Sequence, residues 1–387
     1  MPVRQLPSHP NLDHLKQQAK DLMKARAART LAAAQLIREF HPQFRSATDE
    51  AIFAAEFKLS DAQLTVAREH GFLSWTRLKR RIEKPVPADR LDLPHHERIE
   101  DPVFRHAVDR IDAGDVAGIR AHLKRNPGLA SQRVVFEGGN YFCNPSLLEF
   151  TAENPVRRGK LPPNIVEIAT AILDAGAPQA ALDETLMLVC SGRVPRECGV
   201  QIPLIDVLCD RGARPDLAML AAVGHGEFEA TKALLGHGAL MTLPVAAAMG
   251  RIENVRRLLE TADGENRHRA LAWASQFGHA EIVRLLLEAG EDPDRYNPVG
   301  SHSHSTPLHQ AALAGHEDVV RLLLHHGARA DIRDVLWKGT AADWAAHAGR
   351  KELEAYLRTL EEAAGKQPCG SEGVSGYPGV LTGSPKP

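Results

Sequence analysis

Apolar side chains recur at helical spacing along most of the chain, and the pattern is clearest in the segment from Thr306 to Gly327. Thr306 and Pro307 favour the first positions of a helix, and Gly315 is typical of its end. A second apolar stripe of valine and leucine follows and stops at Gly327. The segment therefore predicts a helix–turn–helix hairpin of about thirty residues.

Such a hairpin needs neighbours, because one unit alone leaves its apolar face open to water. The next unit is present, since Gly349 follows Gly315 by thirty-four residues and also ends an apolar helix pattern. Earlier units with the same outline lie at about residues 104–123, 146–176, 182–212, 218–238, 243–259 and 270–290. The repeats are regular towards the C-terminus and irregular towards the N-terminus.

Two stretches of the clearest hairpin carry a resemblance to a known family. Residues 306–311 read Thr-Pro-Leu-His-Gln-Ala, which is similar to the Thr-Pro-Leu-His-x-Ala signature of ankyrin repeats. Gly315 and His316, followed by Val-Val-Arg-Leu-Leu-Leu, resemble the rest of one repeat. The resemblance implies an all-α ankyrin-repeat solenoid of helix–turn–helix units.

The first eighty or so residues do not follow this repeat. They predict a small helical bundle, with helices at about residues 11–28, 31–40, 49–58, 60–71 and 75–83. Ser60 and Gln63 predict a capping box at the start of the fourth helix. Residues 58–79 resemble a helical segment that precedes ankyrin repeats in many bacterial proteins, which implies an architecture rather than a reaction.

Changes in composition divide the chain. Up to Lys84 there are fifteen Lys and Arg against nine Asp and Glu, a net of +6, so the remainder carries −8 of the total of −2. Three prolines after Lys84 indicate a linker, and a final segment rich in Gly, Ser and Pro predicts disorder. We predict a basic helical domain at 1–84, a linker at 85–99, a repeat array at 100–362 with irregular repeats at 100–240 and clear repeats at 241–362, and a disordered tail at 363–387.

Composition and cysteine usage bound the class of protein. The 387 residues are 43% hydrophobic but only 5% aromatic, as expected where small aliphatic side chains pack helix on helix. No apolar run is long enough for a signal peptide or a membrane span, so we expect a cytoplasmic protein without a membrane contact. The five cysteines form no Cys-x-x-Cys pair and are expected to be free thiols.

Catalytic motifs are missing from the sequence. It has no glycine-rich phosphate loop, no Gly-x-Ser-x-Gly and no His-Glu-x-x-His, and carboxylates such as Glu149 and Glu153 are interpreted as solvated helix faces. His302, His304 and His309 could bind a metal, but the resemblance places His309 at the family's own histidine position, where it would bond loop backbone. We therefore expect no enzyme activity, no cofactor and no metal site.

Function is then expected from the surface of the array. In a solenoid, the inner helices and the turns between repeats form an extended concave face. Carrying the family's exposed positions to this chain predicts a protein-binding surface made of His225, Met249, Gln276, Phe277, His302, Ser303, Ser305, Leu313, Ala314, Leu336, Trp337 and His347. Large apolar groups are typical interface anchors, which favours Trp337. For Phe277 and Met249 the alternative, packing against neighbouring turns, stays open, whereas Trp273 and Trp344 are expected in the core.

The lengths of the connections between repeats favour the C-terminal repeats as the binding region. Sixteen residues lead from Gly290 to Thr306 and thirteen from Gly327 to Thr340, which suffices for projecting hairpin turns. In the middle of the array the connections are only five or six residues long. We therefore expect a partner protein, unidentified by the sequence, to bind mainly at residues 290–345.

Three alternative functions stay open: a nucleic-acid-binding adaptor, an enzyme-associated or substrate-recruiting scaffold, and a toxin or effector. The first rests on the N-terminal domain. Residues 60–83 have the outline of a DNA-binding helix–turn–helix, whose second helix carries Arg77, Lys79, Arg80 and Arg81. The same helix has apolar side chains at helical spacing, so its basic groups could instead be the solvated side of a packing helix or face the acidic array.

Overall fold

The computed structural model describes residues 4, 6, 10–83, 93–136 and 141–365, with side chains through residue 362. Within these ranges the chain forms α-helices, short 3-10 helices and turns, and no β-strand occurs. A single isolated bridge among the described residues pairs Arg133 with Ser146. The predicted all-α class is confirmed.

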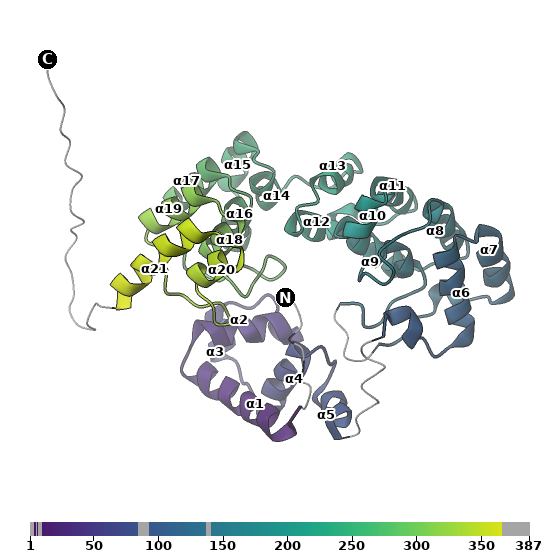
Figure 1. Ribbon diagram of the computed structural model, residues 1–387, viewed down its shortest axis with the longest axis horizontal. Coiled ribbons are helices and arrows are strands. Elements are labelled where there is room, and N and C mark those ends of the chain that lie inside the picture. The colour runs from purple at the N-terminus through teal and green to yellow at the C-terminus, as the bar shows by residue number, and fades with distance from the viewer. Residues whose placement is uncertain (1–3, 5, 7–9, 84–92, 137–140, 366–387) are drawn as a thin grey trace, which may run out of the picture.

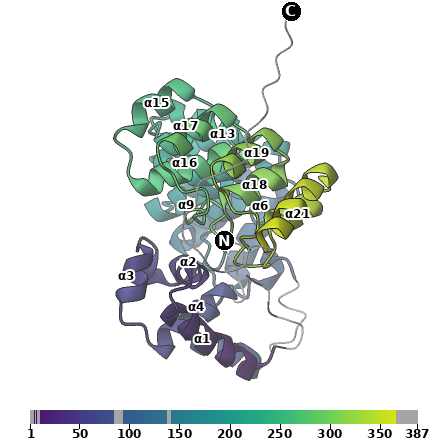
Figure 2. The ribbon, with the colours of Figure 1, turned by 90° about the vertical axis from the view of Figure 1, so that its left-hand side faces the viewer.

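The repeats stack into an arch, and the N-terminal helices lie in its opening (Figure 1). After a turn of 90° the N-terminal helices still lie below the array, on the same side of it (Figure 2). The domain that comes first in the sequence therefore lies on the concave side of the array.

The N-terminal domain has one small apolar core. It consists of α1 (Leu12–Ala27), α2 (Leu31–Phe40), η1 (Pro42–Phe44), α3 (Asp49–Ala54), α4 (Leu59–Glu69) and α5 (Trp75–Glu83). Each α-helix contributes to the core, in which Leu22, Ile37, Ile52, Val66 and Leu78 are buried. This core is separate from those of the array, as expected of a unit with its own hydrophobic interior.

The predicted capping box at Ser60 is wrong. Helix α4 begins at Leu59, and the residue before it, Lys58, occupies the N-cap position. The Lys58 amide donates a hydrogen bond of 2.7 Å to the carboxylate of Asp61. A first-turn aspartate thus satisfies one of the free amides at the helix start, in place of the serine hydroxyl.

The irregular half of the array contains shorter and less uniform elements. They are η3 (His95–Arg98), α6 (Pro102–Ala113), α7 (Val116–Arg125), η4 (Leu129–Ser131), η5 (Leu148–Ala152), α8 (Ile165–Asp174), α9 (Gln179–Cys190), α10 (Arg193–Glu197), α11 (Gln201–Asp210), α12 (Pro215–Gly224) and α13 (Phe228–Gly236). A continuous core runs through them from Phe104 to Leu234. Two repeats carry extra residues between their helices, at about residues 154–163 and 193–201, and helix α10 lies in the second of these insertions.

One buried guanidinium holds the other insertion, between η5 and α8. Arg157 Nη2 lies 2.9 Å from Asp112 Oδ1 and 2.9 Å from Glu153 Oε2. The Glu153 carboxylate also accepts the backbone amides of Arg157 at 2.7 Å and of Gly159 at 3.0 Å. Since a buried charge is tolerated only with such partners, this ion pair fixes the path of the insertion.

The regular half follows the sequence pattern closely. Its helices are α14 (Leu243–Ala248), α15 (Ile252–Leu259), α16 (Gly264–Gln276), α17 (Ala280–Glu288), α18 (Pro307–Ala314), α19 (Glu317–His325), α20 (Ala341–His347) and α21 (Lys351–Gly365). Thr306 is the N-cap of α18, and Gly315 ends that helix in the left-handed conformation with φ of 81°. Both predictions are confirmed.

Histidines join consecutive regular repeats. His279 Nε2 donates a hydrogen bond of 2.9 Å to the carbonyl of Ala248, and His316 Nε2 donates one of 3.1 Å to the carbonyl of Gln276. The His316 ring also covers Gly278, where a Cβ would come within 2.7 Å of the imidazole. Only glycine therefore lets the histidine of the following repeat reach the end of the inner helix.

The predicted domain boundaries fall partly outside the described residues. Residues 84–92 of the predicted linker and residues 366–387 of the predicted tail are not described. Helix α21 continues to Gly365, beyond the predicted end of the array at residue 362. None of the helices in the described ranges is long and apolar enough to cross a membrane.

Candidate protein-binding surface

Asp334 organises the turn that precedes the last inner helix. Its Oδ1 accepts the amides of Leu336 at 2.9 Å and Trp337 at 2.6 Å. Its Oδ2 accepts the amide of Gly339 at 2.8 Å and the indole Nε1 of Trp344 at 3.1 Å. The carboxylate is buried, so four donors close the turn around it and hold Trp337 at its tip.

Aromatic rings support this turn from below. The ring of His304 lies 5.0 Å from Trp337 and 5.5 Å from Trp344, centre to centre. His309 lies 5.3 Å from Trp344, and its Nε2 donates to the carbonyl of Gly339 at 3.2 Å. Burial lowers the pKa of His304 to about 3 and that of His309 to about 4. Both imidazoles are therefore neutral near pH 7 and pack as aromatic rings.

The connection at residues 291–305, called here the long turn, has its own hydrogen bonds. The Asn297 amide donates to the carbonyl of Ser305 at 2.8 Å, which closes the turn on itself. The Val335 amide donates to the carbonyl of His304 at 2.8 Å, which joins it to the next turn. The long turn is thus a fixed structure on the array.

Helix α16 fastens the long turn from the side. Arg269 Nη1 donates to the carbonyl of Val299 at 2.7 Å and to the hydroxyl of Ser301 at 2.8 Å. His268 Nε2 donates to the carbonyl of Arg295 at 3.1 Å. Burial lowers the pKa of His268 to about 3, so this ring is a neutral donor. The hairpin turn expected between Gly290 and Thr306 is present, and these bonds fix its position beside the inner helix.

Helix α2 of the N-terminal domain contacts the long turn. Gln35 Nε2 donates to the carbonyl of Asn297 at 3.3 Å. The hydroxyl of Ser303 donates to Glu39 Oε2 at 2.6 Å. Two polar groups on one helix thus meet the turn that the sequence places at the centre of the binding surface.

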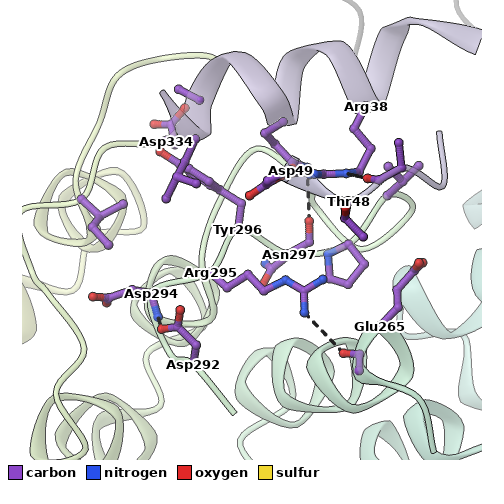
Figure 3. Close-up of a pocket in the computed structure, with 18 of the residues that line it drawn as sticks. Arg38, Thr48, Asp49, Glu265, Asp292, Asp294, Arg295, Tyr296, Asn297 and Asp334 are labelled. Atoms are coloured by element: carbon purple, nitrogen blue, oxygen red, sulfur yellow. Dashed lines mark hydrogen bonds and ion pairs between the residues drawn. The ribbon is translucent and has the colours of Figure 1, made fainter. Parts of the chain in front are cut away.

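A pocket of about 1070 Å³ lies beside this contact, between the two domains (Figure 3). Its lining includes Leu31, Arg38, Arg45 and Asp49 from the N-terminal domain and Glu265, Asp292, Arg295, Tyr296, Arg333 and Lys338 from the array. Six Lys and Arg side chains face six Asp and Glu side chains in the whole lining, so the pocket has little net charge to select an anion or a cation.

Comparison with known proteins identifies the repeats. A family model described as ankyrin repeats (3 copies) matches residues 217–297 and 243–335. Cyclin-dependent kinase 4 inhibitor B of Homo sapiens is 36% identical over 128 residues, which are 32% of this chain and 90% of that protein. The chain belongs to the ankyrin repeat proteins.

Two further relatives give the same picture. The cyclin-dependent kinase 4 inhibitor B of Bos taurus is 35% identical over 129 residues, 32% of this chain and 95% of the relative. Cyclin-dependent kinase inhibitor 2A of Homo sapiens is 34% identical over 120 residues, 30% of this chain and 74% of the relative. These ankyrin repeat relatives are mammalian, so the bacterial origin suggested by the N-terminal segment stays a prediction.

The predicted binding residues divide by exposure on the ankyrin repeat array. The exposed ones are His225, His302, Trp337 and His347. The half-buried ones are Met249, Gln276, Phe277, Leu313, Ala314 and Leu336. Trp337 is the most apolar of the exposed group, with 64% of its surface open to solvent.

Two of the twelve predicted residues are misplaced. Ser303 is 1% exposed and Ser305 is 0% exposed, so neither can touch an external protein in this arrangement. Ser303 is covered because it donates to Glu39, and Ser305 is covered because its hydroxyl donates to the carbonyl of His302 and accepts from Gln310. In this arrangement α2 covers Ser303, whereas groups of the array itself cover Ser305.

Phe277 packs against the repeat of α12 and α13, so the alternative of packing within the array, left open by the sequence, applies to it. Its ring lies 5.0 Å from that of Phe228 and covers Gly226. The adjacent Gln276 Nε2 donates to the carbonyl of Gly224 at 3.2 Å. Met249 is also partly buried against the same core. The main role of these side chains is to hold repeats together. Only their exposed edges are open to a partner.

Sequence reasoning missed Gln35, Glu39 and Arg269. The sequence did contain a signal for Arg269. This residue directly precedes the apolar stripe of an inner helix, in the repeat that leads to the connection between Gly290 and Thr306. A charge in that position needs buried acceptors, and the long turn provides them. Gln35 and Glu39 carried no comparable signal.

The basic helix α5 does not strengthen the nucleic-acid alternative. Lys79 Nζ lies 3.5 Å from Glu83, and Arg77 and Arg81 also have interaction partners. Helix α5 packs Leu78 into the domain core, as the packing-helix interpretation expects. Nucleic-acid binding through Arg77, Lys79, Arg80 and Arg81 stays a prediction.

Proposed function

We propose that this ankyrin repeat protein is a non-catalytic binding module or scaffold, and that a partner protein contacts the concave side around the turn at residues 334–339. The observation that carries the proposal is Trp337, a large apolar side chain left 64% exposed at the tip of a fixed turn. Exposed tryptophans of this kind are common anchors of protein interfaces.

The turn is suited to binding because it is already ordered. Three backbone amides of the turn donate to Asp334, and His304 and Trp344 support the indole of Trp337. A partner that covers the indole would therefore pay little conformational entropy on this side of the interface. The remaining exposed surface of the turn, with Leu336 and Lys338, provides mixed apolar and charged contacts.

The relatives support a protein partner. Their names describe them as inhibitors of cyclin-dependent kinases, which are themselves proteins. We extend to this chain only the class of partner, which is another protein. We do not extend the identity of that partner as a kinase. The matched region is 128 residues long, 32% of the chain, so most of the chain lies outside this comparison.

The non-catalytic part of the proposal rests on where the perturbed carboxyl lies. Burial raises the pKa of Glu149 to about 7, which would suit an acid or base. Its Oε1, however, accepts the amide of Ser146 at 2.7 Å and the hydroxyl of the same residue at 2.9 Å. Glu149 and Glu153 are both buried in the irregular repeats, so their interpretation as solvated helix faces is wrong, and neither lines the pocket beside the long turn. A cytoplasmic location, inferred from sequence, completes the proposal.

Affinity capture with a matched pair of variants tests this function. Wild-type chain, Trp337→Ala and Leu240→Ala are immobilised and exposed to extract of the source cell, and bound proteins are compared by quantitative mass spectrometry. Leu240 is a good control because it is 66% exposed, as open as Trp337, but lies between α13 and α14. We expect a partner that the wild type and Leu240→Ala retain and Trp337→Ala loses.

Direct binding of the purified partner then gives the magnitude. Loss of an interface anchor costs about 2 kcal/mol or more, so Trp337→Ala should weaken the complex by about thirtyfold. Equal binding by Trp337→Ala and wild type, with both chains folded, would rule out this turn as the contact surface.

A further inference from the structure

The contact between α2 and the long turn has the form of helix recognition. Gln35 and Glu39 are four residues apart, so they lie on one face of α2. Gln35 donates to a backbone carbonyl of the turn, at Asn297, and Glu39 accepts from a side-chain hydroxyl of the turn, at Ser303. One face of α2 therefore presents a donor and an acceptor, and the array provides the complementary acceptor and donor.

The contact excludes water at Gln35 and at both residues of the long turn, whereas Glu39 is half-buried. Gln35 is 2% exposed, and both Asn297 and Ser303 are buried. A buried hydrogen bond is specific because leaving either partner unpaired is unfavourable. The two bonds therefore fix both the position and the direction of the helix on the long turn.

The receiving surface is ordered independently of α2. Arg269 holds the turn at Val299 and Ser301, and the Val335 amide holds it at His304. These groups all belong to the array. The long turn would therefore keep its shape if α2 left, which is what a binding site for a separate helix requires.

The docking of the N-terminal domain is incomplete. Next to the two buried hydrogen bonds, a pocket of about 1070 Å³ separates the same two surfaces, with Leu31 and Arg45 on one side and Tyr296 and Arg333 on the other. A permanent interface is normally packed as densely as a protein interior. This contact is therefore suited to exchange.

We propose that the long turn is a helix-binding site, that α2 occupies it within the same chain, and that the partner of the array presents a helix of the same kind in its place. That partner helix carries an amide donor and, four residues later, a carboxylate. The inference rests on the proposed protein-binding function and deepens it, because it names the structural class of the partner. The tethered α2 competes with the partner and sets the apparent affinity of the site.

Hydrogen exchange in the full chain tests occupancy by α2. The double variant Gln35→Ala/Glu39→Ala removes both polar groups, and Asp21→Ala is the control. Asp21 is an exposed carboxylate on α1, which lies on the side of the domain away from the array (Figure 1). We expect faster exchange at the amides of residues 296–305 in the double variant, and wild-type exchange in the control.

A synthetic peptide tests whether the emptied site accepts a separate helix. The fluorescent probe is residues 29–48 of this chain, and its matched control carries alanine at positions 35 and 39. Alanine favours helix more than glutamine or glutamate does, so weaker binding of the control peptide cannot come from lost helicity. We expect the probe to bind the double variant about tenfold more tightly than it binds the wild type.

A substitution in the array distinguishes the release of α2 from the recognition of the probe peptide. Ser303→Ala removes the hydroxyl that meets Glu39, so it should speed exchange in the long turn yet give no tighter binding of the probe. If the double variant unfolds by circular dichroism, Glu39→Ala alone replaces it in both measurements.

Two results would overturn the inference. One is unchanged exchange at residues 296–305 in the folded variant, which would mean that α2 does not cover the turn. The other is equal probe binding by wild type and variant, or none by either, which would mean that the turn does not recognise a separate helix. Either failure, with partner capture still dependent on Trp337, would leave the proposed protein-binding function standing.

Discussion

The imidazole of His304 meets the indole of Trp337 edge to face, with ring centres 5.0 Å apart. Its Nδ1 has no hydrogen-bond partner, so the ring acts mainly by packing. Phenylalanine can replace it in shape but cannot take up a proton. The variant His304→Phe therefore isolates the effect of protonation at this position.

His304→Phe should make the protein more tolerant of acid. The pKa of this imidazole falls from 6.5 in the unfolded chain to about 3 in the folded one. As pH drops below 6.5, the unfolded chain takes up this proton first, so the free energy of unfolding falls until about pH 3. One such group contributes at most about 1.4 kcal/mol per pH unit. Urea unfolding between pH 7 and pH 4 should show a shallower decline for the variant.

The control for this experiment is His347→Phe. His347 is exposed at the end of α20, so its ring meets solvent in both states. The variant should follow the wild-type pH profile. A shallower profile for His347→Phe as well would assign the effect to a general change in charge.

Asp334→Ala should loosen the turn that carries Trp337. The substitution leaves the indole of Trp344 and three backbone amides without their acceptor. Unsatisfied buried donors cost about 1–3 kcal/mol, and we expect a loss of that size in the free energy of unfolding. Asp331→Ala, which removes only an exposed ion pair with Arg329, should change it by less than about 1 kcal/mol. Equal losses in the two variants would contradict the role given to Asp334.

Gly278→Ala should destabilise the array more than Gly290→Ala does. Both glycines have positive φ, at 79° and 90°, so both variants carry a similar backbone penalty of about 1–2 kcal/mol. Only at Gly278 does the new Cβ meet the ring of His316, at 2.7 Å. Displacing that ring should add about 1–3 kcal/mol, measurable as a lower urea midpoint. Identical midpoints would show that the ring moves aside freely.

Arg157→Ala should be among the most damaging changes in the irregular repeats. It leaves Glu153 buried without its cation and leaves Asp112 with Arg158 alone, which costs about 3–5 kcal/mol. Arg158→Ala is the matched control, because Arg158 also binds Asp112 but is partly exposed. We expect the control to lose less than about 1 kcal/mol in urea unfolding. A mild effect of Arg157→Ala would mean that water replaces the guanidinium.

The regular repeats were predictable because their rules are local. Thr306 and Gly315 bound a helix through their own backbone preferences, and Trp273 and Trp344 were expected in the core and are buried. The fixed period then carried the same interpretation from one repeat to the next. The sequence-based prediction was therefore most successful where one unit contacts only its neighbours.

The contacts of the long turn were not predictable because they are not local. Its length predicted a hairpin turn, but Arg269 and His268 hold that turn by bonds to backbone carbonyls, which leave no pattern in the sequence of the turn itself. The partner groups on α2, Gln35 and Glu39, are more than 250 residues away in sequence. Hydrophobic periodicity contains no information about such a polar contact.

The separation of Glu39 from Ser303 has a consequence for synthesis of the chain. These residues are 264 positions apart, so the ribosome completes α2 long before it reaches the turn that covers it. At about 5–20 residues per second, the interval lasts on the order of tens of seconds. During that time the face of α2 with Gln35 and Glu39 is open to chaperones or to another chain on the same messenger. Closure of the contact therefore marks the moment at which the last repeats have been made and folded.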